Sequence, residues 1–273
     1  MVKLIKNEWK RYRIFSLVML LTAVGMALIL ALLVVLTLNL SNEKDTLSDI
    51  ASYGNFAMVC IIISVLPSAA VIYCILSYAA DIGRKGMIFL TPVSTWKIIS
   101  SKLIYAAATF LLLYAVSFGG ILLASDISNM IGSDPDCKEM AEMIRKFAVG
   151  RYLSFREIEN FPLEALMKFI LSFLSTMHMS ILVIASISLA RFAANSVGIQ
   201  VLLSIVFYFI VALIERLIDM LIAMLMNNEN IWRSMFEYSL GNTVWSMLSL
   251  VVYSVILYIV CACLTDKKVN LVS

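Results

Sequence analysis

Long apolar runs alternate with shorter polar segments along the whole chain. A run of about 20 apolar residues, coiled as a helix, is long enough to cross the hydrocarbon core of a bilayer. Six runs meet this requirement, at residues 15–38, 56–79, 98–124, 165–190, 197–214 and 244–264. The pattern predicts an all-α membrane protein with six transmembrane helices, which together form one domain over residues 1–273.

The fifth apolar run is interrupted by charge. Its apolar character continues to Met226, past Glu215, Arg216 and Asp219. Glu215 and Asp219 are four residues apart, so they share a helix face and repel each other. If they are buried, they require a cation or a basic partner. We favour the other interpretation, in which the span ends near Ile214 and residues 215–226 form an external amphipathic helix.

The first 13 residues have a pattern of their own. On a helical wheel the larger apolar side chains fall on one face and the basic side chains on the other. This predicts an amphipathic helix in the inner headgroup layer, with its bases on anionic lipid. A plain basic flank of the first span is the alternative. The two faces consist of Met1, Val2, Ile5, Trp9 and Tyr12, and of Lys3, Lys6, Lys10 and Arg13.

Composition agrees with a membrane location, because 62% of the residues are hydrophobic and only 14% are charged. A soluble domain of this length would not bury so much apolar surface. The first apolar run is also too long for the core of a cleavable signal peptide, so we expect it to stay attached. We interpret the five cysteines as small apolar residues, because their spacing suits neither a disulfide nor a metal site.

The distribution of charge predicts the orientation. Basic residues near helix ends are retained in the cytoplasm. With the N-terminus inside, cytoplasmic segments carry 12 bases and three acids, and external segments carry the other 9 bases and 15 acids. We therefore expect both termini in the cytoplasm. The cytoplasmic set is Lys3, Lys6, Lys10, Arg11, Arg13, Arg84, Lys85, Lys97, Lys102, Arg191, Lys267 and Lys268, with Glu8, Asp81 and Asp266.

The segment between the second and third runs contains a short apolar stretch at residues 87–90, within a predicted cytoplasmic loop. Gly86 allows a sharp change of direction before it. Thr91 suits a helix cap and Pro92 suits a first helical turn. An apolar stretch in such a loop needs a partner protein or the membrane surface.

This segment resembles the first cytoplasmic loop of type-2 ABC transporter permeases (the ABC-2 type), through its run Gly-x-x-x-Leu-Thr-Pro-Val-Ser from Gly86 to Ser94. The basic N-terminal helix, the long external loop at 125–162, the interrupted fifth helix and the basic tail agree in layout. In that family the loop holds a coupling helix that docks on a separate ATPase. The implied docking residues are Gly86, Met87, Ile88, Phe89, Leu90, Thr91 and Pro92. Met87 and Ile88 stand where many relatives carry an acidic residue. A loop resting on lipid is the alternative.

The resemblance implies a permease subunit in a bacterial plasma membrane that exports an amphipathic peptide, an antibiotic or a lipid-like substrate. It implies a partner ATPase that holds ATP and Mg²⁺, and a second permease, identical or homologous, that completes the pore. The chain has no Gly-x-x-x-x-Gly-Lys-Ser/Thr loop for a cofactor nucleotide of its own. It shows no catalytic constellation, and we expect neither an enzyme nor a nucleic-acid partner. The alternatives are a sensor or immunity protein that binds a peptide without transport, and an ion-coupled transporter.

His178 is the only histidine, and it lies in the middle of the fourth run. We favour a hydrogen bond to a neighbouring helix over a proton relay or a metal site. Met177 and Met179 flank it but point in other directions, so no metal site is expected. Ionisable groups inside a membrane are often functional. His178, Glu215 and Asp219 are therefore our candidates for the substrate path.

Overall fold

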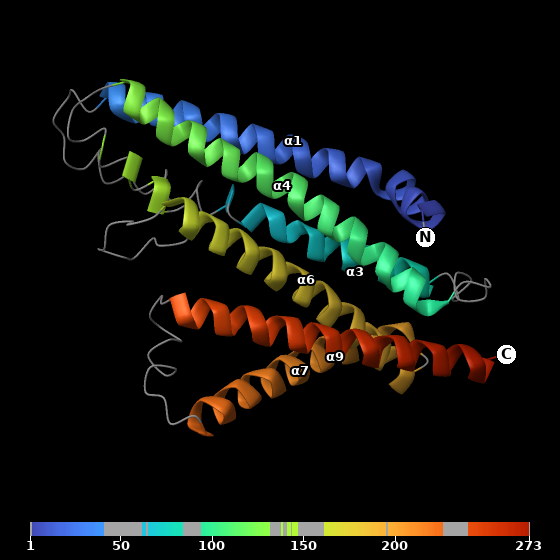
Figure 1. Ribbon diagram of the computed structural model, residues 1–273. Coiled ribbons are helices and arrows are strands. Elements are labelled where there is room, and N and C mark those ends of the chain that lie inside the picture. Colours follow the sequence, from blue (N-terminus) through green and yellow to red (C-terminus); the bar gives the residue numbers. More distant parts are fainter. Residues whose placement is uncertain are drawn as a thin grey trace. The chain divides into compact units, whose positions relative to one another are not determined.

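The computed structural model describes residues 2–40, 62–63, 65–83, 94–131, 138, 141–142, 144–146, 161–194, 196–225 and 240–272. Every secondary-structure element in these ranges is helical (Figure 1). The elements are α1 (Val2–Leu40), the 3₁₀ turn η1 (Leu66–Ser68), α3 (Ala69–Gly83), α4 (Thr95–Ile131), α6 (Phe161–Ala193), α7 (Val197–Leu225) and α9 (Leu240–Val272).

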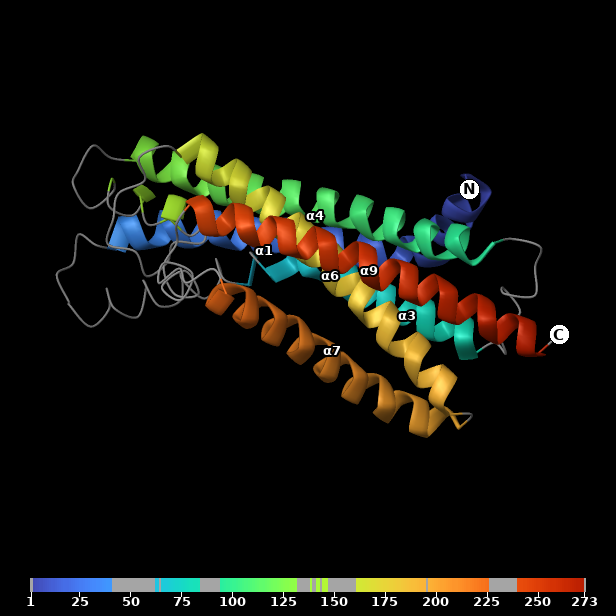
Figure 2. The same cartoon turned by 60° about the horizontal axis from the view of Figure 1, so that its bottom comes forward.

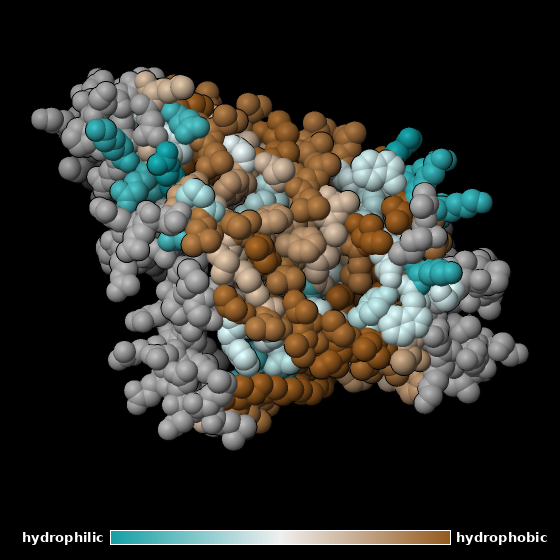
Figure 3. Space-filling model, in the orientation of Figure 1, coloured by the Kyte–Doolittle hydropathy of each residue, from teal (hydrophilic) through white to brown (hydrophobic). Residues whose placement is uncertain are grey.

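Five helices within the described ranges are long and apolar enough to cross a membrane. They are Lys3–Val35, Trp96–Ser128, Phe161–Ala193, Gly198–Ile222 and Val244–Leu264. Hydrophobic residues also make up most of the described surface on the face in Figure 3. The chain is thus an all-helical, multi-pass membrane protein. The predicted second span, 56–79, lies partly outside the described residues, and η1 and α3 occupy its second half.

The contacts group the chain into two compact units, although the sequence pattern predicted a single domain. Unit 1 comprises Met1–Lys10, Ala70–Ala107 and Ile170–Ser273, and unit 2 comprises Arg11–Ala69 and Ala108–Phe169. Helices α1, α3, α4 and α6 each contribute residues to both units.

Residues 2–13 do not form a separate helix. They are the N-terminal turns of α1, which continues from Val2 to Leu40. The chain has no proline or glycine before Gly25, so nothing interrupts the backbone hydrogen bonds between the basic segment and the first span. Helix α1 contains 39 residues, of which residues 2–10 belong to unit 1 and the rest to unit 2.

The separate helix expected over residues 215–226 is not present in the described part of that range. Helix α7 continues without a break from Val197 to Leu225, and its candidate span reaches Ile222. No proline or glycine follows Gly198 in this helix. The charged residues therefore lie within the helix, and no separate external helix begins at position 215.

The core of unit 2 is a small set of aliphatic contacts between α1, α4 and residues on the connecting segments. Figures 1 and 2 show α1 and α4 running side by side. Gly120 lies so close to Ala27 that an added Cβ would be 2.5 Å from the Cβ of Ala27. Small residues allow this approach between membrane helices. The two buried clusters are Leu30, Val34, Ile63, Ile121, Ala124 and Ile144, and Ala23, Ala69 and Leu113.

Part of the external segment predicted at 125–162 joins this core. Its described positions 138, 141–142 and 144–146 are helical, and Ala141 and Ile144 are buried. Arg145 donates from Nε to the Ser125 hydroxyl at 3.2 Å. These described positions are therefore packed on one side against the rest of unit 2.

Candidate functional site

The seven predicted docking residues, 86–92, lie outside the described residues. The two helices that flank them are described: α3 ends at Gly83 and α4 begins at Thr95. Both flanking ends belong to unit 1, and they are referred to here as the hairpin arms. Both arms contact other helices of unit 1.

A buried ion pair connects the hairpin arms to the N-terminal turns. The Lys102 ammonium lies 3.1 Å from Glu8 Oε1, and the Tyr73 hydroxyl donates to Glu8 Oε2 at 2.9 Å. Lys102 and Tyr73 are 0% exposed and Glu8 is 7% exposed. Each carboxylate oxygen thus has a donor, which offsets much of the cost of burying the charge. Glu8, Tyr73 and Lys102 form the arm cluster.

Aromatic rings enclose the arm cluster. The Tyr73 and Tyr105 rings are 4.3 Å apart between centroids, and the Trp9 ring contacts Tyr105 edge-on at 5.8 Å. These rings come from α1, α3 and α4, the helices that carry the ion pair. They add apolar contacts between the three helices beside the pair.

Sequence reasoning missed the arm cluster, because it treated Glu8 and Lys102 only as orientation charges. The sequence did contain one indication that Glu8 is buried. Glu8 follows Ile5 by three residues and precedes Tyr12 by four, so it lies on the apolar face of the N-terminal turns. An acid on that face requires a basic partner, but the sequence does not show which one.

Two further contacts hold the hairpin arms. The Tyr78 hydroxyl lies 2.7 Å from the Ser188 hydroxyl, which joins α3 to α6. The Tyr258 hydroxyl lies 2.5 Å from the Ser100 hydroxyl, and its ring packs edge-on against Trp96 at 5.0 Å, which joins α9 to α4. The arms are therefore connected to α1, α6 and α9.

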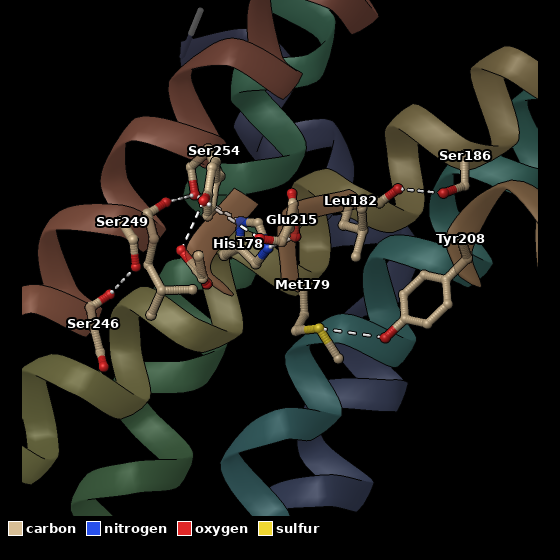
Figure 4. Close-up of polar contacts among 12 residues, drawn as sticks. His178, Met179, Leu182, Ser186, Tyr208, Glu215, Ser246, Ser249 and Ser254 are labelled. Atoms are coloured by element: carbon tan, nitrogen blue, oxygen red, sulfur yellow. Dashed lines mark hydrogen bonds and ion pairs between the residues drawn. The ribbon is translucent and has the colours of Figure 1, made fainter. Parts of the chain in front are cut away.

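The second polar group in unit 1 contains all three candidate substrate-path residues. His178 Nε2 lies 3.1 Å from Glu215 Oε2, and His178 Nδ1 lies 3.2 Å from the Ser254 hydroxyl (Figure 4). The Tyr253 hydroxyl donates to Asp219 Oδ1 at 2.7 Å. These five residues from α6, α7 and α9 form the His178 cluster.

The His178 cluster lies deep within the spans. His178 is close to the middle of α6 (Phe161–Ala193), and Ser254 is close to the middle of α9 (Leu240–Val272). Glu215 contacts His178 directly, so it lies at a similar depth. Its side chain is only 14% exposed. Helix α7 can therefore continue past Ile214, because both carboxyl groups have polar partners from neighbouring helices.

Four polar residues of α7 lie on one stripe, and Arg216 is exposed outside it. Ser204, Tyr208, Glu215 and Asp219 recur at the spacing of one helix face, and all four are half-buried. The remaining faces carry exposed apolar residues, among them Leu202, Val206, Phe209 and Leu213. The polar stripe faces α6 and α9, and the apolar faces suit lipid.

Two other predictions concerned the absence of a metal site and the role of the cysteines. Among the side chains that the structure describes, no group of His, Cys, Asp or Glu residues could hold a metal ion. Cys74 and Cys261 are buried and Cys263 is exposed, and none of these three described cysteines is in a disulfide.

Comparison with known proteins gave no relative: no family model matches the chain, and neither the curated proteins nor the solved structures contained a match.

Proposed function

We propose that this chain is the membrane-spanning permease subunit of an ATP-driven exporter, with ATP hydrolysis on a separate partner. In this proposal the termini and residues 84–93 are in the cytoplasm of a bacterial cell. Residues 86–92 dock on the ATPase, and a second permease copy or a homologous one completes the pore. The substrate is an amphipathic peptide, antibiotic or lipid-like molecule.

The observation that supports the proposal is the set of buried and partly buried contacts on the hairpin arms. A partner protein that displaces this loop can move the pore-forming helices only if the helices that flank the loop are rigidly joined to the other spans. Glu8–Lys102, Tyr78–Ser188 and Ser100–Tyr258 provide such joints to α1, α6 and α9. Together with the resemblance of residues 86–94, they favour a coupling role over a loop resting on lipid.

The His178 cluster supports a path for a polar or charged group through unit 1. Placing two carboxyl groups and an imidazole at the depth of the hydrocarbon core costs free energy, and ionisable groups found there are often functional. Asp219 is half-buried, so its carboxylate is partly accessible in unit 1. The cluster is therefore the part of the described chain best suited to contact a cationic group of the substrate.

Replacing Phe89 and Leu90 with aspartate should abolish association with the ATPase and leave membrane insertion intact. An unpaired carboxylate in an apolar interface costs several kcal/mol, so recovery of the partner should fall at least about tenfold. The measurement is purification of the tagged chain in mild detergent from its native host, with mass spectrometry of the proteins that accompany it.

A matched control is Met130→Asp, because Met130 is 86% exposed at the other end of α4. It should retain the partner at the wild-type level. A Phe89→Asp/Leu90→Asp variant that still co-purifies with the ATPase would show that the docking assignment is wrong. A wild-type chain that recovers no ATPase would contradict the transporter proposal itself and favour a sensor or immunity protein.

A further inference from the structure

Both ring nitrogens of His178 have a polar neighbour, although the residue is only 5% exposed. One neighbour is the Ser254 hydroxyl and the other is the Glu215 carboxyl (Figure 4). An imidazole nitrogen either donates a proton or accepts one, so each contact must contain one hydrogen. The identity of the donors therefore decides the protonation state of the ring.

Ser254 cannot donate to His178. Its hydroxyl lies 2.6 Å from the backbone carbonyl oxygen of Leu250. Two oxygens at this distance need a hydrogen between them, and the carbonyl has none to give. The single hydroxyl hydrogen of Ser254 is therefore donated to Leu250, and the Ser254 oxygen can only accept a hydrogen bond from His178. His178 Nδ1 must donate, so it carries a proton.

The contact with Glu215 also requires a hydrogen. If Nε2 carries it, the ring is an imidazolium beside a carboxylate. If the carboxyl oxygen carries it, a neutral ring accepts from a carboxylic acid. Both arrangements place one proton on the contact, and both give the His178–Glu215 pair a net charge of zero. A pair without this proton would set the lone pair of Nε2 against a carboxylate.

The described neighbours of the pair come from α7 and α9. From α7, Asp219 lies one turn from Glu215 on the same helix face, and from α9 the Tyr253 ring centroid lies 6.5 Å from that of His178. The Tyr253 hydroxyl donates its hydrogen to the Asp219 carboxylate. Arg216 is exposed. A neutral pair costs far less than a lone carboxylate at this depth in a membrane.

We propose that the His178–Glu215 pair is a proton-binding site, and that its bound proton holds α6, α7 and α9 in the packing seen here. Loss of the proton converts the contact between α6 and α7 from attraction to repulsion. The bound proton therefore decides whether α6 and α7 attract or repel each other at this contact within unit 1. This proposal involves neither an ATPase nor a substrate. An experiment that contradicts it therefore leaves the transporter proposal unaffected.

The sole histidine makes a direct test practical. In chain labelled with ¹⁵N-histidine and reconstituted in lipid nanodiscs at neutral pH, the ring nitrogen signals belong to His178 alone. Two results support the proposal. Either both nitrogens carry hydrogen, or Nδ1 alone does and Glu215→Gln removes one carboxylic-acid carbonyl band from the infrared spectrum. Two results overturn it: an Nδ1 without hydrogen, or protonated Nδ1 alone with no such band lost.

A pair of serine variants tests the reasoning about Ser254. Ser254→Ala removes the acceptor for Nδ1–H, so the Nδ1 signal of the ring should shift from its wild-type position. Ser249→Ala is the matched control, because Ser249 lies on the same helix and donates to the Ser246 carbonyl at 3.1 Å. It should leave the ring spectrum unchanged. A Ser254→Ala spectrum identical to the wild type would contradict the proposal.

Discussion

Replacing Glu8 with alanine should lower the free energy of unfolding by about 3–5 kcal/mol, the usual cost of removing one partner from a buried ion pair. The variant leaves the fully buried Lys102 ammonium without this carboxylate and removes the acceptor of the Tyr73 hydroxyl. The measurement is chemical or thermal unfolding of the purified chain in detergent, compared with the wild type.

Two further variants make this result specific. Glu142→Ala removes a partly exposed ion pair with Lys146 at 2.8 Å, and should cost no more than about 0.5 kcal/mol. Glu8→Leu combined with Lys102→Met removes both buried charges and should regain most of the stability, because apolar replacements of buried pairs are often neutral. Equal losses for Glu8→Ala and Glu142→Ala would show that Glu8 and Lys102 are not a buried ion pair.

Gly120→Ala should destabilise unit 2 by about 1–3 kcal/mol, a typical cost of overpacking. The added methyl group would lie 2.5 Å from the Cβ of Ala27, whereas carbon atoms in contact are about 3.5–4.0 Å apart. Helices α1 and α4 must then separate locally and lose contacts of their buried aliphatic residues. The measurement is the same unfolding experiment.

Gly119→Ala is the control, because in the described part of the chain no atom lies within 4 Å of a Cβ built there. Alanine favours helix more than glycine does, so this variant should be neutral or slightly stabilising. Gly120→Ala combined with Ala27→Gly should recover stability, since the nearest remaining atom is the Ala27 Cα at 3.4 Å. If Gly120→Ala and Gly119→Ala unfold alike, the close approach of the two helices is wrong.

The positions of most helices could be predicted from the apolar runs. The runs at 15–38, 98–124, 165–190 and 244–264 lie within α1, α4, α6 and α9. A helix satisfies its backbone hydrogen bonds within one segment, so a long apolar run without proline is sufficient to specify it in lipid. Helix ends were harder to predict, because charge alone does not stop a helix when a partner is present, as at Glu215.

The candidate sites were only partly predictable. His178, Glu215 and Asp219 attracted notice because ionisable groups are rare in apolar runs, and the structure brings them together in the His178 cluster. The expected hydrogen bond from His178 to a neighbouring helix is confirmed. The prediction of a separate helix beginning at position 215 is wrong, because α7 continues to Leu225. The prediction weighed the mutual repulsion of Glu215 and Asp219 but could not include the donors from α6 and α9.

The sequence by itself determined that the chain is helical, that lipid is its solvent, and approximately where most spans lie. These properties follow from local composition and from hydrogen bonds four residues apart. Only the tertiary structure decided that Glu8 pairs with Lys102, that Glu215 meets His178 in the middle of the spans, and that Gly120 contacts Ala27. Such pairings depend on the rotation and depth of each helix, which packing against the other helices sets.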